Sequence, residues 1–403
     1  MNYKSFFSAS LDEMKQQGRY RYFANLQRKC GDFPRAVNGD QENQQDVTVW
    51  CSNDYLGMGQ HPKVLQAMKD AIDTYGAGAG GTRNISGTTC LHVELEREIA
   101  KVHGKEAALI FTSGYVANEA ALSTLGSKLP DCVIFSDQNN HASMVHGIRS
   151  SRAPKHIFKH SDPEDLERLL KQHPKDQAKI VAFESIYSME GDIAPVEEFV
   201  ELCEEYNAIS YIDEVHGVGL YGRSGGGIVQ QLNLCNRLDV IQGTFGKAIG
   251  LIGGYIAGSK ELIDFVRSYA PGFIFTTALP PAILGGIIAS IKHLETSHKE
   301  REIHQLRAAY LKSALTRAGI PFYPSSSHIV PIIVGDAAIC KNVTDTLMNE
   351  FNIYVQPINY PTVPMGTERI RLAPTPMHTE KMIDDLVSAL SEIWARLNIK
   401  MAA

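Results

Sequence analysis

Five short apolar segments constrain the fold of this chain more than any other feature of its sequence. Each has the length of a strand, ends in small or polar residues, and is usually followed by a helical pattern. The segments are residues 107–111, 132–135, 180–183, 209–212 and 240–241. Apolar strands that alternate with helices are typical of a mostly parallel sheet covered on both faces. Ligands of such sheets bind beyond the carboxyl ends of the strands, so we expect the polar residues after these segments to surround one site.

The pattern predicts an α/β protein with three parts. Residues 1–47 are expected to form an N-terminal helix and arm, residues 48–290 a large α/β domain, and residues 291–403 a smaller α+β domain. One long helical pattern, over residues 281–319, connects the last two parts. Length alone is compatible with this division, because chains of 403 residues usually contain more than one domain.

Composition excludes several classes of protein. The net charge of −6 argues against non-specific binding to nucleic acid, which needs an excess of basic residues. The seven cysteines are scattered and form no CxxC pair, so we expect neither a disulfide framework nor a metal site. No signal-type apolar core follows Met1, and the longest apolar stretch, residues 278–291, is too short to span a bilayer. We therefore expect a cytoplasmic protein.

Lys247 lies in a loop of small and apolar residues that follows a predicted strand, within Gly243-Thr244-Phe245-Gly246-Lys247-Ala248. An isolated lysine is usually a solvated surface charge. Small apolar neighbours instead suit a desolvated amine that is able to form a Schiff base. The sequence thus makes Lys247 a candidate for covalent catalysis.

Asp213 follows another predicted strand, within Tyr211-Ile212-Asp213-Glu214-Val215-His216. Burying a carboxylate costs free energy unless a positive group pairs with it, and a protonated pyridine nitrogen is such a group. Pyridoxal phosphate requires that proton to withdraw electrons from its substrate. His216 is then placed to hydrogen-bond the phenolic oxygen of the cofactor. A structural cap or a buried ion pair is the alternative role for Asp213.

The segment Thr112-Ser113-Gly114-Tyr115-Val116-Ala117-Asn118 is expected to be a turn from a strand into a helix. Backbone N–H groups at a helix start bind a phosphate well, although an ordinary N-cap has the same pattern. His141 follows a third strand and is placed to stack on a cofactor ring. Residues 76–81 match GxGxxG, but they follow a helical pattern rather than a strand, so we expect no dinucleotide site there.

Together these segments resemble the α-oxoamine synthases, a family of fold-type I pyridoxal-phosphate enzymes. The motifs that carry the resemblance are residues 50–58, 80–88, 139–144, 183–189, 269–275 and 354–362. The similarity extends from about residue 18 to about residue 395. It implies a fold-type I transferase with a large, mostly parallel-sheet domain and a smaller α+β C-terminal domain.

The resemblance implies that Lys247 forms the Schiff base, that Asp213 pairs with the pyridinium nitrogen, and that His141 stacks on the ring. Further implied contacts to pyridoxal phosphate are Ser113, Gly114, Tyr115, Glu184, Ser188, His216 and Thr244. Thr276 and Thr277 would contact the cofactor phosphate of a neighbouring subunit. The family therefore implies a homodimer with active sites at the subunit interface.

Within that family the motifs are most similar to members that condense glycine with succinyl-coenzyme A, releasing coenzyme A and carbon dioxide and forming a tetrapyrrole precursor. Arg371 and Asn53 would bind the glycine carboxylate, which suits the planar fork of arginine. Thr82 would crowd any amino acid larger than glycine. The implied contacts to the acyl donor are Arg21, Asn84, Ser136 and Thr362 at the succinyl end and Lys155 at coenzyme A.

Two alternatives accompany this interpretation. The first is a sister synthase that uses another acyl-coenzyme A or amino acid, such as 2-amino-3-ketobutyrate CoA ligase. Arg21 argues against it, because an acetyl or fatty acyl chain offers this side chain nothing to pair with. The second is a catalytically inactive homologue with a regulatory role, against which the intact catalytic set argues. Three positions depart from the family pattern, namely Phe245, Ile249 and Met365.

Overall fold

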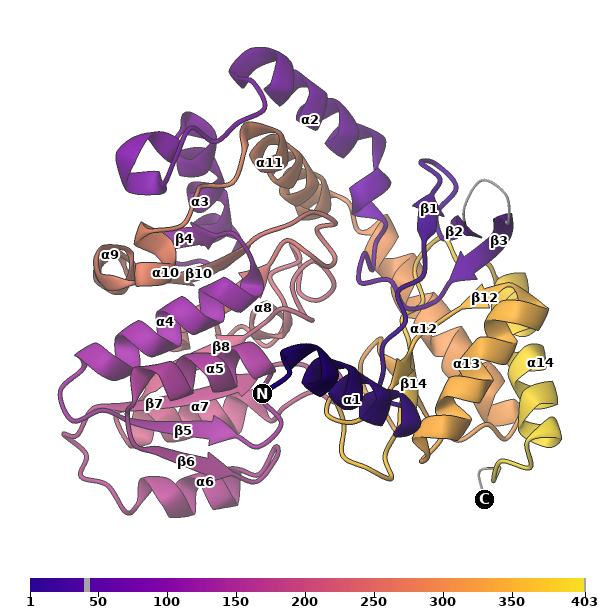
Figure 1. Cartoon of the computed structure of the whole chain (residues 1–403). Coiled ribbons are helices and arrows are strands. Elements are labelled where there is room, and N and C mark those ends of the chain that lie inside the picture. Colours follow the sequence, from indigo (N-terminus) through magenta and orange to yellow (C-terminus); the bar gives the residue numbers. More distant parts are fainter. Residues whose placement is uncertain (40–43, 402–403) are drawn as a thin grey trace. The chain divides into compact units, whose positions relative to one another are not determined.

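The computed structural model describes residues 1–39 and 44–401, which form two compact units (Figure 1). The large unit comprises residues 58–188 and 193–301. The small unit comprises the described parts of residues 1–57, 189–192 and 302–403. The domain boundaries expected after residues 47 and 290 stay a prediction.

A seven-stranded sheet forms the centre of the large unit, in the order β4-β10-β9-β8-β7-β5-β6. Strands β5 to β9 pair in parallel, and β10 is antiparallel to both of its neighbours. The sheet is thus mostly parallel, as the apolar segments predicted. Its strands are β4 (Ala107–Phe111), β5 (Val133–Asp137), β6 (Lys155–Phe158), β7 (Lys179–Glu184), β8 (Ile209–Asp213), β9 (Val240–Thr244) and β10 (Gly254–Gly258).

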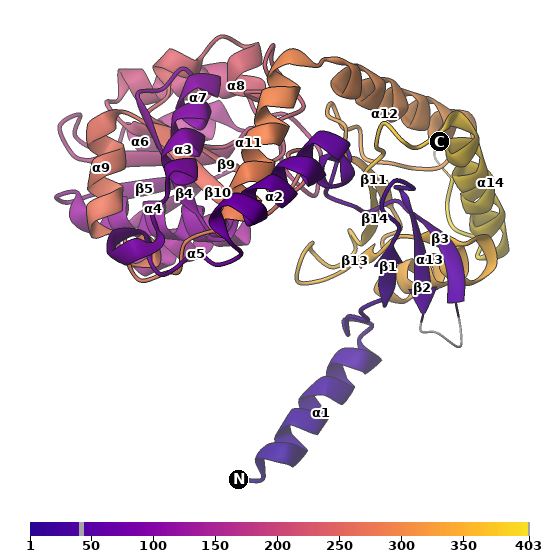
Figure 2. The same cartoon turned by 90° about the horizontal axis from the view of Figure 1, so that it is seen from above.

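Helices cover both faces of this sheet, because its strands are apolar on both sides. The longer helices of the unit are α2 (Pro62–Tyr75), α3 (Cys90–Val102), α4 (Gly114–Lys128), α5 (Ala142–Ser151), α6 (Pro163–Leu170), α7 (Val196–Glu205), α9 (Lys260–Tyr269) and α11 (Pro281–Thr296). Shorter turns are η1 (Met58–Gln60), η2 (Arg83–Gly87), α8 (Ile228–Gln231), η3 (Cys235–Arg237) and α10 (Pro271–Ile274). Figure 2 shows α4 and α5 on one side of the sheet and α7 on the other.

Helix α4 approaches the sheet closely because its inner face carries small residues. A Cβ atom built on Gly126 would lie 2.8 Å from side-chain atoms of both Ile134 on β5 and Ser151 on α5. Only glycine fits this position without displacing its neighbours.

No helix within the described residues is long and apolar enough to cross a bilayer.

The small unit contains two small sheets, one in the order β1-β2-β3-β12 and the other β11-β14-β13. Buried Trp50 and Trp394 contribute to its apolar core. Its strands are β1 (Leu26–Arg28), β2 (Arg35–Gly39), β3 (Gln44–Val49), β11 (Val330–Ile333), β12 (Ile353–Tyr354), β13 (Pro357–Ile358) and β14 (Arg369–Leu372). Its helices are α1 (Tyr3–Gln16), α13 (Ala337–Phe351), α14 (Glu380–Arg396) and most of α12 (Lys299–Arg317).

The single long helix predicted over residues 281–319 is wrong, because the chain forms α11 and α12 with a break at residues 297–298. The Ser297 hydroxyl donates to the Glu300 carboxylate at 2.5 Å. Arg301 donates to the carbonyl of Leu294 at 2.6 Å, across the break. Such local side-chain hydrogen bonds compete with the helical pattern and end the first helix. Apolar periodicity alone does not reveal this competition.

Glu214 holds the glycine-rich loop that follows β8. Its fully buried carboxylate accepts from the Ser185 hydroxyl at 2.7 Å and from the Val229 N–H at 2.6 Å. A Cβ atom on Gly217 or Gly227 would lie within 2.5 Å of this carboxylate, so the loop folds tightly around it. Burial raises the pKa of Glu214 to about 7, against the opposing effect of its hydrogen bonds.

We expect Glu214→Gln to remove part of the pH dependence of stability. A carboxyl group whose pKa is raised by folding contributes stability that is fully present below its unfolded value of 4.5 and is lost as pH rises through about 7. The free energy of unfolding of the wild type, relative to the glutamine variant, should therefore fall by about 3 kcal/mol over that range. Denaturant titrations at both ends of the range measure it, with exposed Glu198→Gln as the control. A constant difference between wild type and Glu214→Gln would contradict this interpretation.

Candidate active site

Asp213 ends strand β8 and is buried, with 3% of its surface exposed. Its Oδ2 accepts from the Asn118 side-chain amide at 2.7 Å, and its Oδ1 accepts from the Val215 N–H at 2.8 Å. Burial raises the pKa of this carboxyl group, and the two hydrogen bonds and the nearby His141 and Lys247 oppose the rise. The site therefore favours a positively charged partner for Asp213.

Lys247 lies in the turn after β9, where Thr244 ends the strand. Its Nζ is 2.6 Å from Nε2 of His216. The Thr244 hydroxyl donates to the carbonyl of Gly253 at 2.8 Å and accepts from the N–H of Gly246 at 3.1 Å. The turn is thus fixed on both sides of the lysine. The pair of Lys247 and His216 was not predicted from the sequence, although both residues follow strands at the same sheet edge.

His141 follows β5 and caps the first turn of α5. Its N–H donates to the Glu184 carboxylate at 2.6 Å, and its Nδ1 lies 2.7 Å from the Ser143 hydroxyl. The ring is accessible at the surface of the unit, yet desolvation by the surrounding protein lowers its pKa. Glu184 ends β7 directly beside Asp213 in the sheet register, and burial followed by the charge of Asp213 raises its pKa well above 4.5.

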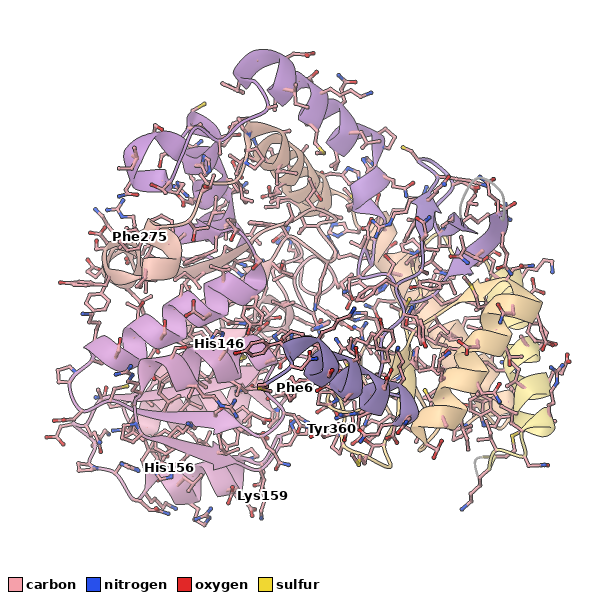
Figure 3. The ribbon with its side chains drawn as sticks, in the orientation of Figure 1. Phe6, His146, His156, Lys159, Phe275 and Tyr360 are labelled. Carbon is pink, nitrogen blue, oxygen red and sulfur yellow. The ribbon has the colours of Figure 1, made fainter. Side chains whose placement is uncertain are left out.

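The turn into α4 has the features of an anion site. The Ser113 side chain caps the helix by accepting from the N–H of Val116 at 3.1 Å. A Cβ atom on Gly114 would lie 3.2 Å from the Cβ atom of Thr244, so the backbone approaches the end of β9 closely. The Tyr115 hydroxyl lies 3.1 Å from Nδ1 of His146, a residue of α5 labelled in Figure 3.

These side chains fit pyridoxal phosphate. The described hydrogen bonds to buried Asp213 come from neutral donors, so a cationic ring nitrogen would complete its environment. Lys247 supplies an amine, and the start of α4 supplies N–H groups for a phosphate. Asp213, Lys247 and Ser113 belong to strand ends at one edge of the sheet, as the sequence predicted.

The other predicted residues of the large unit have varied surroundings. Ser136 on β5 is buried and accepts from the Asn140 amide at 2.9 Å, whereas Lys155 at the start of β6 is exposed.

The Thr82 hydroxyl donates to the Asn84 side chain at 2.7 Å. Thr82 also pairs with Thr277 in an isolated bridge. Ser188 follows β7, and the Thr276 hydroxyl donates to the carbonyl of Gly272 at 2.7 Å. Their roles stay predictions.

Arg371 lies on β14 of the small unit, with 7% of its surface exposed. Its Nη2 donates to the Tyr55 hydroxyl at 2.7 Å, and its Nη1 lies 3.4 Å from Oδ1 of Asn53. The small unit thus brings together Arg371 and Asn53, the two residues implied to bind a substrate carboxylate. Tyr55, which packs against His328 with ring centroids 4.7 Å apart, holds the guanidinium in place.

Arg21 and Thr362 also meet in the small unit. Nη2 of Arg21 donates to the Thr362 hydroxyl at 3.1 Å. Both residues line a cavity of about 640 Å³, together with Arg19, Tyr354 and Tyr360. Cationic and aromatic side chains in one cavity suit an anionic ligand with an apolar portion.

Sequence reasoning missed the supporting residues Asn118, Ser143 and Tyr55. Asn118 is a buried polar residue among alanines on the inner face of α4, and this contrast was the available signal. Tyr55 lay within a motif that resembled the family but had no role assigned. A hydrogen bond between side chains distant in sequence depends on tertiary packing, so its partner is not readable from the local pattern.

Comparison with known proteins shows the family to which the chain belongs. The family model described as aminotransferase class I and II matches residues 45–390. The 5-aminolevulinate synthase of Rhizobium meliloti (strain 1021) is 58% identical over 402 residues, covering 100% of both chains. That of Bradyrhizobium diazoefficiens is 52% identical, covering 100% of this chain and 98% of the relative. A solved structure of a lysine-to-alanine variant of serine palmitoyltransferase from S. paucimobilis, with a bound PLP–myriocin aldimine, has a TM-score of 0.89 and 28% identity, covering 97% of each chain.

The fold and the site define a fold-type I transferase that depends on pyridoxal phosphate. Within aminotransferase class I and II, the chain belongs to the 5-aminolevulinate synthase family. The relatives support the main interpretation of the sequence over the sister-synthase alternative. Because these relatives are named as synthases, they also support an acyltransferase over an inactive homologue.

We expect Tyr55→Phe to destabilise the small unit by about 1–3 kcal/mol, because it leaves a buried guanidinium N–H of Arg371 without its partner. The matched control is Tyr354→Phe in the same unit, whose hydroxyl accepts from Gln356 at 2.7 Å and is only partly buried. Denaturant titration of both variants measures the loss. Equal losses would show that Tyr55 has no special role in holding Arg371.

Proposed function

We propose that this chain condenses glycine with succinyl-coenzyme A and releases coenzyme A, carbon dioxide and 5-aminolevulinate, the precursor of tetrapyrroles. The observation that carries the proposal is the buried Asp213 carboxylate at the same sheet edge as the Lys247–His216 pair. When bound, pyridoxal phosphate supplies an electron sink for the α-carbon of the amino acid. A ring nitrogen kept protonated by Asp213 is what makes that sink effective.

Different side chains of the large unit hold the cofactor and transfer the proton. Lys247 would hold the cofactor through its side-chain amine, and the free amine would remove a proton from the glycine α-carbon and return one to the product. His216, 2.6 Å from Nζ, orients that amine. His141 presents its accessible ring for stacking, and the N–H groups after Ser113 bind the phosphate.

The side chains of the small unit bind the two carboxylates of the substrates. Arg371, with Asn53, binds the carboxylate of glycine, and Arg21, with Thr362, binds the terminal carboxylate of the succinyl group. A new bond then forms between the glycine α-carbon and the thioester carbonyl carbon. The coenzyme A thiolate leaves, and the resulting β-keto acid loses the original glycine carboxylate as carbon dioxide.

We further propose a homodimer in which Thr276 and Thr277 contact the cofactor phosphate of the partner subunit. Phe275, which comes directly before Thr276 and is labelled in Figure 3, supports this proposal, because 80% of its surface is exposed. Ile85, in the predicted substrate loop, is 79% exposed. Large exposed apolar side chains beside a proposed site are typical of surfaces that a partner covers.

The expectation of a cytoplasmic protein stays a prediction.

Lys247→Ala should lose covalent attachment of the cofactor. Borohydride fixes pyridoxal phosphate permanently to the lysine that carries it, so wild type should yield a cofactor-labelled peptide containing Lys247. The variant should yield none, whereas Lys260→Ala, which removes an exposed lysine of the same unit, should be labelled like wild type. Mass spectrometry of the digests measures the labelling. Labelling of Lys247→Ala at another lysine in full yield would remove Lys247 from the proposed role.

Arg21→Ala should change selectivity for the acyl donor. The wild type should form an amino ketone with glycine and succinyl-coenzyme A and much less with acetyl- or longer acyl-coenzyme A, and product mass identifies each case. Without the Arg21 side chain, kcat/KM for succinyl-coenzyme A should fall by about 10- to 100-fold, while that for acetyl-coenzyme A should hardly change. Arg28→Ala, on exposed β1, is the control. A wild type that prefers acetyl-coenzyme A would refute the proposed substrate.

A further inference from the structure

A buried hydrogen-bond chain connects two groups proposed to face the cofactor. It consists of Tyr211, Asn118 and Ser143, which join Asp213 to His141. Exposed fractions are 0% for Tyr211, 1% for Asn118 and 0% for Ser143. The chain joins β8, α4 and α5, so it depends on the tertiary fold rather than on one local segment.

The direction of every hydrogen bond in this chain follows from the donors available. The Tyr211 hydroxyl donates to Oδ1 of Asn118 at 2.8 Å, which leaves the amide N–H groups pointing the other way. Those N–H groups donate to Oδ2 of Asp213 at 2.7 Å and to the Ser143 hydroxyl at 3.0 Å. A flipped amide would place its oxygen against the Asp213 carboxylate, which can only accept, so the carboxylate fixes the amide orientation and Oδ1 is left to accept from Tyr211.

The same chain fixes the tautomer of His141. The backbone N–H of Ser143 donates to Nδ1 of His141 at 3.3 Å, so Nδ1 acts as an acceptor. The Ser143 hydroxyl accepts from Asn118 and lies 2.7 Å from the same Nδ1, to which it donates its own proton. A neutral His141 therefore carries its proton on Nε2. The lowered pKa of His141, caused first by desolvation, is in keeping with a neutral ring.

We propose that the Tyr211–Asn118 pair is the positioning element of the cofactor site, orienting the Asp213 carboxylate directly and the His141 ring through Ser143. This inference rests on the proposed function, because it assigns Asp213 and His141 to the cofactor. Asn118 supplies a charge-assisted hydrogen bond to an anion that burial would otherwise disfavour. Other titratable groups that act on Asp213 or respond to its charge are His141, Lys247, Glu184, Glu214, Tyr211 and Tyr255.

The test uses Asn118→Leu, Tyr211→Phe and the double variant of the full-length protein. Losing the bond to Asp213 should weaken pyridoxal phosphate binding by about 10- to 100-fold in Asn118→Leu. The midpoint of the pH titration of the bound cofactor's visible absorbance should also move to lower pH, because a less ionised Asp213 holds the ring proton less firmly. Tyr211→Phe should move both quantities in the same direction by a smaller amount.

The double variant separates positioning from stability. In Asn118→Leu the Tyr211 hydroxyl is left buried without its acceptor, whereas the double variant removes both groups and should recover part of the lost thermal stability. Cofactor affinity should stay weak in the double variant, because the donor to Asp213 is still missing. If cofactor affinity recovers together with stability, or is unchanged in Asn118→Leu, the positioning role is overturned.

A matched control and a fallback keep the outcomes distinct. Tyr255→Phe removes an equally buried hydroxyl on β10, bonded to His103 at 2.8 Å, and should leave cofactor binding within about twofold of wild type. If Asn118→Leu does not fold, Tyr211→Phe decides, and wild-type affinity and titration in it overturn the inference. A wild type that binds no pyridoxal phosphate would instead refute the proposed function itself.

Discussion

The burial of Asp213 is the constraint on which the rest of the large unit depends. A carboxylate with 3% exposure at the end of a central strand has lost most of its hydration. The parallel register places Glu184 beside it on the neighbouring strand. Burial raises the pKa of both carboxyl groups, and the charge of Asp213 raises the pKa of Glu184 further. Neutral donors only partly compensate such a pair. A cationic cofactor ring, together with the Lys247 amine, would supply the positive charge that these hydrogen bonds do not.

Close packing at the sheet edge follows from the same requirement. The start of α4 has to reach the end of β9 for helix N–H groups, Thr244 and Lys247 to surround one ligand. A Cβ atom on Gly254 would lie 2.4 Å from the backbone nitrogen of Gly114, so position 254 admits only glycine. Phe245 and Ile249, which depart from the family pattern, are buried beside this turn. The ring of Phe245 packs against that of Tyr255, with ring centroids 5.1 Å apart. Phe245 and Ile249 therefore belong to the packing beneath Lys247.

Much of the large sheet was predictable because strands buried on both faces have a continuous apolar pattern. Strand β4 begins and ends at the predicted residues, and Asp213 lies at a strand end as expected. The loop matching GxGxxG follows helix α2, as the helical pattern before it predicted. The prediction of one helix over residues 281–319 was wrong, because the hydrogen bond between Ser297 and Glu300 favours a break that the apolar periodicity does not reveal. Strands β1 to β3 were missed because their short, partly exposed segments lack a distinct pattern.

The candidate site was predictable to a smaller extent. Strand ends indicated Lys247 and Asp213, since the edge of a parallel sheet gathers residues that follow each strand. Arg371 with Asn53 and Arg21 with Thr362 are 318 and 341 positions apart, so only the family resemblance joined them. Asn118 had no role assigned, because its partners come from β8 and α5 and depend on how the helix packs.

The two arginines of the small unit differ in a way that matters for selectivity. Arg371 is buried and held by Tyr55 and Asn53, so its fork has little freedom and favours a carboxylate in one orientation. Arg21 is exposed, and an exposed ion pair contributes little because water screens it. Arg21 can discriminate between acyl groups only where its cavity excludes water around the bound ligand. Tyr354 and Tyr360 line that cavity, so we expect them to limit the screening of the Arg21 charge by water, which the proposed selectivity requires.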